Sequence, residues 1–212
     1  MMRPTILPIP WSAPVLRTLS VAVLFLAFTV PASGQILWGA PPLVSHVAPA
    51  GLSLFAIKPD GGDLGGLVTF RHAAGPIGLG YRFAISDEDG SDGMAVAGGV
   101  DISGFLVRAF EGSEVDVMWW SGAGLGIGQE TIVSFPVGAL LGWSGQGGGV
   151  ILSPYGGGHV SLDISTSDVN SVQLVGSFDL GLDVVLASGW LVRFGASIGD
   201  SDALALGIKI GS

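Results

Sequence analysis

The stretch from Val172 to Leu186 alternates between two kinds of side chain along its whole length. Its even positions are apolar apart from Gly176. Its odd positions are mostly small or polar: Gln173, Val175, Ser177, Asp179, Gly181, Asp183 and Val185. Because side chains of a β-strand alternate between its two faces, this period of two predicts a strand with one apolar face. Strands of soluble domains usually run about 5 to 6 residues, so a strand this long requires a wide apolar surrounding.

About ten segments after Gly51 follow the same rule, and turns rich in glycine and aspartate separate them. We expect strands at Leu52–Lys58, Leu64–Ala73, Ile77–Ser86, Met94–Ser103, Glu114–Gly126, Thr131–Trp143, Val150–Ser165, Val172–Leu186, Trp190–Gly199 and Ala203–Gly211. The first two are weakly patterned, and residues 104–113 could hold a short extra strand or a helical turn. The strand count is therefore about ten, within a range of eight to twelve.

The first 34 residues have the pattern of an export signal. Arg3 and Arg17 precede an apolar run at Leu19–Val30, and small residues follow it at Pro31–Gly34. The run is shorter than the roughly 20 residues that a membrane-spanning helix needs. We therefore expect cleavage before Gln35, followed by an extended periplasmic lead-in at 35–50 and a β domain at 51–212.

The charge of the mature chain excludes one class of partner. Removal of Arg3 and Arg17 leaves six of the eight basic side chains against 17 acidic ones. So acidic a protein repels nucleic-acid phosphates, and we expect no DNA or RNA partner. The chain has no cysteine, so neither disulfides nor thiol chemistry is available to an exported protein of this sequence.

The composition favours a particular β fold. Hydrophobic residues make up 49% of the chain, yet no run after the leader is long enough for a membrane helix, and 36 glycines disfavour helices in general. A closed antiparallel up-and-down transmembrane β-barrel resolves this, because its apolar residues occupy alternate positions instead of one continuous run. A soluble secreted β-sandwich binding protein is the alternative all-β reading.

The sequence resembles the small outer-membrane β-barrel proteins, including the opacity and attachment types. The shared features are strands of about ten residues, an export signal, and glycine-rich pieces such as Pro154–Gly158 and Gly207–Lys209. The resemblance covers about residues 51–212 and rests on pattern. It implies a porin-like barrel in the outer membrane of a Gram-negative-type bacterium. Outer-membrane lipid, lipopolysaccharide and the barrel-assembly machinery are the implied partners. Such barrels usually end on an aromatic residue, whereas this sequence ends Ile210-Gly211-Ser212.

Acidic residues gather in alternate turns. If ten strands begin and end in the periplasm, the outer connections are residues 59–63, 87–92, 127–130, 166–170 and 199–202. They hold ten of the 17 acidic residues: Asp60, Asp63, Asp87, Glu88, Asp89, Asp92, Glu130, Asp168, Asp200 and Asp202. This sorting of charge supports the strand count. Trp143 and Trp190 then fall at the inner ends of their strands, where an aromatic girdle would lie.

The same alternation predicts which charged side chains face the barrel lumen. They are Arg71, Arg82, Asp101, Asp116, Asp163, Asp179, Asp183, Arg193 and Lys209. A barrel of eight to ten strands has little more room than its own side chains fill, so we expect a packed, salt-bridged interior rather than a wide channel. In particular, Asp179 and Asp183 are expected to pair with Arg or Lys, while Phe178 and Leu180 face lipid.

His159, Ser161 and Asp163 are the weak candidates for catalysis, because they occupy alternate positions on one strand face. A histidine two residues from a serine resembles the pair of outer-membrane lipid A deacylases, in which the histidine acts as the general base. That family's pair faces lipid, whereas here Val160, Leu162 and Ile164 take the apolar side. We therefore assign no catalytic residues and expect no enzyme, with a lipid A-modifying enzyme as the alternative.

Two further motifs have simple interpretations. The carboxylates of Asp87, Asp89 and Asp92 resemble part of a calcium-binding turn, but the distant bidentate glutamate is missing, so we predict a solvated loop that could hold divalent cations loosely. The glycine-rich run Gly122–Gly128 lies within a strand pattern, which argues against a phosphate-binding loop. No dedicated metal site or cofactor is predicted.

Overall fold

The structure is a computed structural model that describes residues 37–38, 50–59, 64–72, 77–87, 93–107, 115–166 and 171–210. Its contacts divide the chain into two units, Met1–Val30 and Pro31–Ser212, and every described residue belongs to the second. In the described residues, no helix has the length and apolar character needed to cross a membrane.

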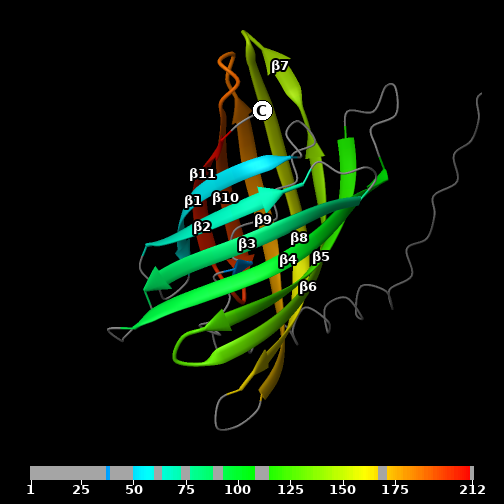
Figure 1. Cartoon of the computed structure of the whole chain (residues 1–212). Coiled ribbons are helices and arrows are strands. Elements are labelled where there is room, and N and C mark those ends of the chain that lie inside the picture. Colours follow the sequence, from blue (N-terminus) through cyan, green and yellow to red (C-terminus); the bar gives the residue numbers. More distant parts are fainter. Residues whose placement is uncertain are drawn as a thin grey trace, which may run out of the picture. The chain divides into compact units, whose positions relative to one another are not determined.

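In the described residues, the second unit is built from β-strands (Figure 1). They are β1 (Gly51–Pro59), β2 (Gly65–Arg71), β3 (Ile77–Asp87), β4 (Met94–Val107), β5 (Val115–Ile127), β6 (Thr131–Trp143), β7 (Gly145–Gly147), β8 (Val150–Ser165), β9 (Ser171–Val185), β10 (Leu191–Gly199) and β11 (Ala203–Ile210). The predicted segments at 131–143 and 150–165 have the observed bounds, and the others differ by a few residues.

Ten of these strands form a closed antiparallel ring. Each strand from β1 to β5 pairs with the next, β6 pairs with β8, and the series continues from β8 to β11, which pairs with β1. The short β7 pairs only with β8 and forms a hairpin beside the ring. The predicted up-and-down barrel is thus confirmed, whereas the alternative of two packed sheets is wrong because one sheet closes on itself.

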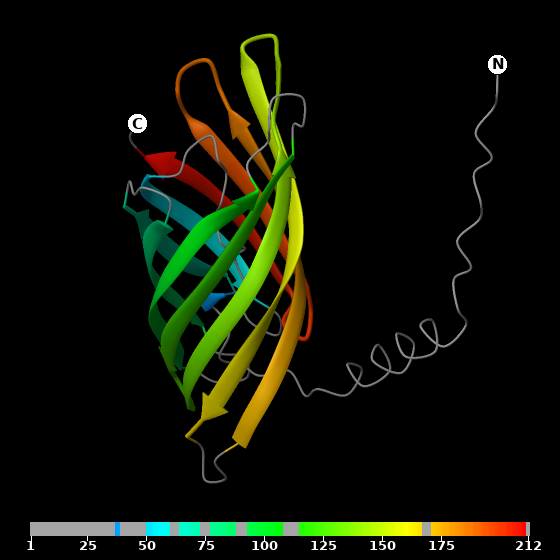
Figure 2. The same cartoon turned by 90° about the vertical axis from the view of Figure 1, so that its right-hand side faces the viewer.

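The direction of the strands sorts the connections between two ends of the barrel. We call the end where β1 begins and β11 ends the termini-side mouth, and the opposite end the far mouth. The connections near β7 and between β9 and β10 lie beside the end of β11 at the termini-side mouth (Figure 2). The five acidic connections predicted from the sequence all join strands at the far mouth.

The two weakly patterned regions have physical explanations. β1 and β2 alternate poorly because Phe55, Ile57 and Leu67 face inward and are buried, so both faces of these strands carry apolar residues. In the segment predicted to hold an extra strand or turn, residues 104–107 simply continue β4, past a register irregularity between Phe105 and Val107. The rest of that segment lies outside the described residues.

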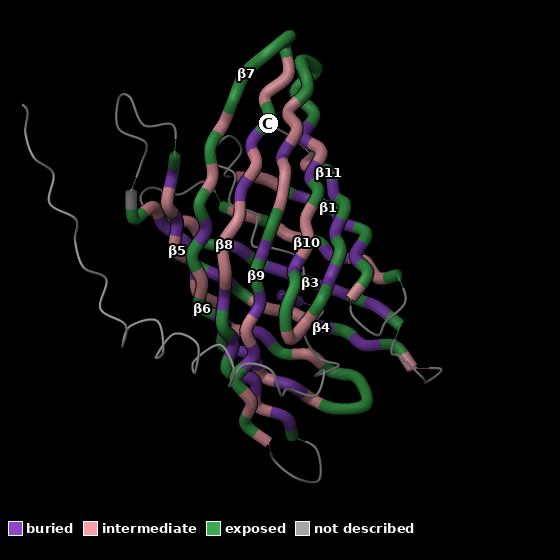
Figure 3. Tube along the Cα trace, turned by 180° about the vertical axis from the view of Figure 1, so that it is seen from behind, coloured by how far each residue is buried: buried purple, intermediate pink, exposed green. Residues whose placement is uncertain are grey.

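The faces of the strands are inverted relative to a soluble protein. Among the described residues, 36 large hydrophobic side chains are exposed, whereas 17 polar or charged residues are buried. Exposed and less exposed positions alternate along the strands (Figure 3). Soluble monomers rarely expose contiguous apolar patches of more than a few hundred Å², so this surface requires an apolar medium or partner.

Three aromatic side chains fill the lumen by lying over glycines on the neighbouring strand. Trp120 pairs with Gly138, Tyr155 with Gly181, and Phe55 with Gly207. A Cβ atom on Gly138 would lie 2.6 Å from the indole nitrogen of Trp120, and Cβ atoms on the other two glycines would also collide with their aromatic partners. These positions therefore require glycine so that the large rings can pack against the inner wall.

Candidate functional site in the barrel lumen

A cluster of two arginines around one carboxylate lies toward the termini-side mouth. Arg82 on β3 donates from Nε to Asp101 Oδ2 on β4 at 2.9 Å, and Arg71 on β2 pairs with the other oxygen of that carboxylate. Arg71 also donates to the hydroxyl of Ser103 at 2.7 Å. The carboxylate fits because a Cβ on the register-paired Gly80 would be 2.7 Å from Asp101 Oδ2. Among the described residues, two guanidinium groups thus share the single carboxylate of Asp101.

A second ion pair joins two neighbouring strands. Arg193 on β10 lies directly opposite Asp183 on β9 and forms a fork of two hydrogen bonds with its carboxylate, from Nε at 2.5 Å and from Nη2 at 2.6 Å. Asp183 is completely buried and the side chain of Arg193 is 5% exposed. A bidentate pair of this kind fixes the relative position of both side chains as well as their charges.

Asp179 forms a third cluster and differs from the prediction. Instead of an arginine or lysine, the buried carboxylate contacts Nδ1 of His159 on β8 at 2.8 Å and accepts a hydrogen bond from Ser197 on β10 at 2.9 Å. The expectation of an arginine or lysine partner was wrong for Asp179 because strand register, not charge, decides which side chain lies opposite. Register places Ser197 beside Asp179, and the basic residues lie on other rows.

The candidate catalytic residues all face the lumen. His159, Ser161 and Asp163 are buried on β8, and the hydroxyl of Ser161 donates to Asp163 at 2.5 Å while His159 contacts Asp179. The imidazole therefore contacts one carboxylate and the serine hydroxyl another. The apolar Val160 and Leu162 are exposed on the outside of the same strand.

The remaining predicted lumen residues are placed at the termini-side mouth. Asp116 is buried near the start of β5, and Lys209 is half-buried near the end of β11.

The candidate cation loop lies at the opposite end, where Asp87 is exposed at the end of β3, at the far mouth. Asp89 and Asp92, the other members of the proposed cation loop, lie outside the described residues, and the described part of the chain contains no group of three or more potential metal ligands.

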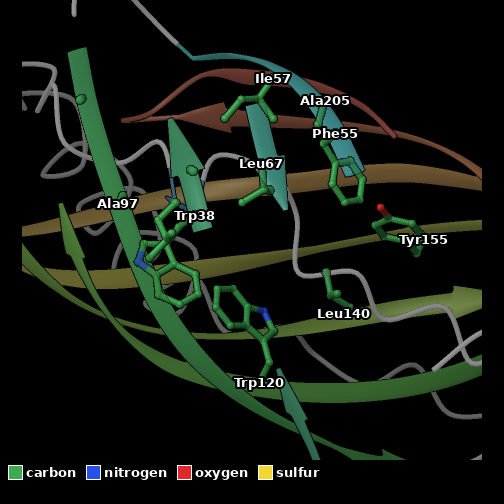
Figure 4. Packing of buried hydrophobic residues seen from close by; sticks show 12 residues of the cluster. Trp38, Phe55, Ile57, Leu67, Ala97, Trp120, Leu140, Tyr155 and Ala205 are labelled. Atoms are coloured by element: carbon green, nitrogen blue, oxygen red, sulfur yellow. The ribbon is translucent and has the colours of Figure 1, made fainter. Parts of the chain in front are cut away.

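Leu37 and Trp38 lie inside the barrel, although they precede its first strand by more than ten residues. They are 2% and 1% exposed and belong to the buried apolar cluster of the lumen (Figure 4). The Trp38 ring packs against Trp120, with centroids 5.7 Å apart. Arg82 contacts both Leu37 and Trp38. Its guanidinium lies 5.0 Å from the centroid of the Trp38 ring and donates a hydrogen bond to the Leu37 carbonyl at 3.3 Å. We call these two residues the plug.

Glycines on two neighbouring strands make room for the plug. Gly99 on β4 lies opposite Gly124 on β5, and a Cβ on either would collide with Leu37; the one on Gly99 would be 2.5 Å from Leu37 Cδ2. A Cβ on Gly122 would be 2.6 Å from the Trp38 ring. The inner wall of β4 and β5 is thus shaped to receive these two side chains.

Sequence reasoning did not predict the plug. The expected lead-in at 35–50 gave Leu37 and Trp38 no role, and most of it lies outside the described residues. The available signal was Gly99, Gly122 and Gly124, which all fall on inward positions of adjacent strands. Such a patch without side chains must be filled by something else if the interior is to be close-packed.

No protein-family model matches this sequence, and comparison with curated proteins found no match either.

Proposed function

We propose that the chain is an outer-membrane β-barrel protein with a structural or adhesive role and at most weak conductance. The observation that carries the proposal is the inversion of its two surfaces, apolar outside and polar inside. Strands of about 9 to 11 residues span an outer membrane, and most of the ring strands are at least that long. A membrane supplies the apolar medium that the outer surface requires.

Aromatic residues support an orientation in which the termini-side mouth faces the periplasm. Trp143 and Trp190 are exposed near the termini-side mouth, and so is the stacked pair of Phe70 and Tyr81, whose centroids are 6.5 Å apart. Tryptophan and tyrosine favour the membrane–water interface. The far mouth carries acidic residues, among them Asp87, Glu130 and Asp200, which suits a surface facing the outside of the cell.

Cell fractionation tests the location directly. We expect the full chain, expressed in a Gram-negative host, to be recovered in the outer membrane and to migrate differently on a gel with and without heating. Recovery in the soluble periplasm or the medium would contradict the proposal.

A pair of arginine substitutions tests which face meets lipid. Leu180→Arg places a charge on the outer face near the middle of β9 and should destabilise the barrel in lipid by about 2–4 kcal/mol. Leu204→Arg, near the far mouth, should cost about 0–1 kcal/mol because the charge can reach water. Urea unfolding in lipid vesicles, with migration on an unheated gel as the readout, measures the loss of unfolding free energy in each variant. Equal losses in the two variants would argue against a membrane-spanning outer face.

The filled lumen supports the absence of a wide pore. Side chains of the plug, Trp120 and Tyr155 belong to one buried apolar cluster inside the ring. We expect no stable large single-channel steps when the purified barrel is inserted into a planar bilayer. Such steps would contradict an occluded lumen while leaving the membrane location intact.

A non-enzymatic role is part of the proposal. His159 and Ser161 face the lumen, away from the side where a lipid substrate would lie. Ser161→Ala is therefore expected to leave the acylation of lipid A unchanged in cells that produce the protein. A change in acylation caused by this substitution would favour the deacylase alternative.

A further inference from the structure

A pocket opens at the termini-side mouth of the lumen. It is lined by residues from six consecutive strands of the ring, β4, β3, β2, β1, β11 and β10. Its basic side chains are Arg71, Arg82, Arg193 and Lys209, and Asp101 is the acidic residue in its lining.

One row of this wall consists entirely of hydrogen-bond donors or hydroxyls. Lys209 lies opposite Ser53, Ser53 opposite Thr69, and Thr69 opposite Arg82, so these four residues are side by side on β11, β1, β2 and β3. Register partners point to the same face of a sheet, and here that face is the lumen. Ammonium and guanidinium groups only donate hydrogen bonds, whereas the two hydroxyls can donate or accept. The row therefore offers donors to a ligand from four neighbouring strands.

The charges of the pocket do not balance. Asp101 is shared by Arg71 and Arg82, and Asp183 neutralises Arg193. Within the part of the chain that the structure describes, Lys209 forms no hydrogen bond or ion pair with another residue. Among the described residues that line the pocket or pair with its lining, four cations therefore face the two carboxylates of Asp101 and Asp183. Bringing cations together in a partly buried site is unfavourable unless an anion compensates them.

From this arrangement we propose that the termini-side mouth is a binding site for a small oxyanion, a phosphate or carboxylate group. Lys209 supplies a positive charge on a long side chain, the more exposed Arg71 supplies a planar donor, and Ser53 and Thr69 supply hydroxyl donors from the wall between them. Arginine forks match the geometry of phosphate and carboxylate oxygens. The site rests on the fold of the lumen alone, so it can be tested independently of the membrane location.

Titration of inorganic phosphate into the full chain, folded in a neutral detergent, tests the site by calorimetry at constant ionic strength. Lys209→Gln removes one charge-assisted hydrogen bond and should weaken phosphate binding about tenfold. Thr69→Val, which removes only a hydroxyl, should also weaken phosphate binding. This variant tests the site if Lys209→Gln fails to fold. The matched control is Lys58→Gln, because Lys58 is on β1 as well but at the far mouth; its affinity should stay unchanged.

Several results would overturn the proposal. These are an absence of phosphate binding, equal binding by wild type and Lys209→Gln, or equal losses in Lys209→Gln and Lys58→Gln. The anion could also come from a lipid headgroup. If the protein is retained on vesicles of phosphatidic acid but does not bind free phosphate, the anion site is a lipid site on the outer surface and the proposed lumen site is wrong.

Discussion

Two walls of the same lumen are filled in different ways. On β8, β9 and β10, inward side chains such as His159, Asp179 and Arg193 occupy the space themselves and are fixed by mutual hydrogen bonds. On β4 and β5, the inward positions include Gly99 and Gly124, and the space is filled by the plug. We call these the polar wall and the glycine wall.

The interior of a small barrel can therefore be filled in two ways. The polar wall is complete within the ring, so its stability depends on keeping each buried charge paired. The glycine wall is complete only when a segment from outside the ring enters the lumen, so its packing depends on a part of the chain that strand pairing does not hold. Substitutions in the two walls should therefore fail in different ways.

The largest effect is expected for the ion pair of the polar wall. Asp183→Ala leaves Arg193 buried without its carboxylate and should lower the free energy of unfolding by about 3–5 kcal/mol. Urea titration with the unheated gel as readout measures the loss. The control is the double variant Asp183→Leu with Arg193→Met, which removes both charges and should be much closer to wild type. A double variant as unstable as Asp183→Ala would mean that the packing of these side chains matters more than their charges.

A smaller effect on stability is expected in the glycine wall. Gly124→Val places a side chain where Leu37 packs, and overpacking typically costs about 1–3 kcal/mol. We expect the strain to be relieved by displacement of the plug while the ring stays folded, because valine favours strands. The chain has no cysteine, so a single Leu37→Cys substitution reports exposure through its rate of reaction with a charged maleimide.

That labelling rate should rise in the Gly124→Val background. The matched control is Ala123→Val, one residue earlier on the same strand and on the opposite face, which should leave the rate unchanged. If Gly124→Val unfolds the ring as severely as Asp183→Ala, the glycine wall is as integral to the barrel as the polar wall.

Of the substitutions that compare the two walls, Asp179→Asn in the polar wall should have the smallest effect. Asparagine keeps an oxygen that can accept the hydrogen bond from Ser197, and no arginine loses its counter-charge. The expected cost is about 1 kcal/mol, close to that of one ordinary hydrogen bond. The same urea titration measures it; a loss as large as that of Asp183→Ala would show that His159 depends on this carboxylate as strongly as Arg193 depends on Asp183.

Most of the fold could be predicted because alternation is a local property. In β9 the inward Asp179 and Asp183 and the outward Phe178 and Leu180 were assigned correctly from parity alone, since successive side chains of a strand must point to opposite faces. β1 was harder, because Phe55 and Ile57 are apolar and yet face inward. Where both faces are apolar, periodicity carries no information about which side is the core.

The partners of the lumen residues could not be predicted from the sequence. Arg71 reaches Asp101, 30 residues away, and His159 reaches Asp179, 20 residues away. These pairs depend on register and on the tilt of strands around the ring, and a shift of two residues would keep every face correct while changing every partner.

The period of two and the turn chemistry are enough to predict antiparallel alternating strands, their approximate number and the placement of acidic connections at one end. The entry of Leu37 and Trp38 into the lumen depends on the closed ring, and so does the row of Lys209, Ser53, Thr69 and Arg82. The physical reason is that closure of the ring brings together residues from the two ends of the chain, and no local pattern records which side chains then meet.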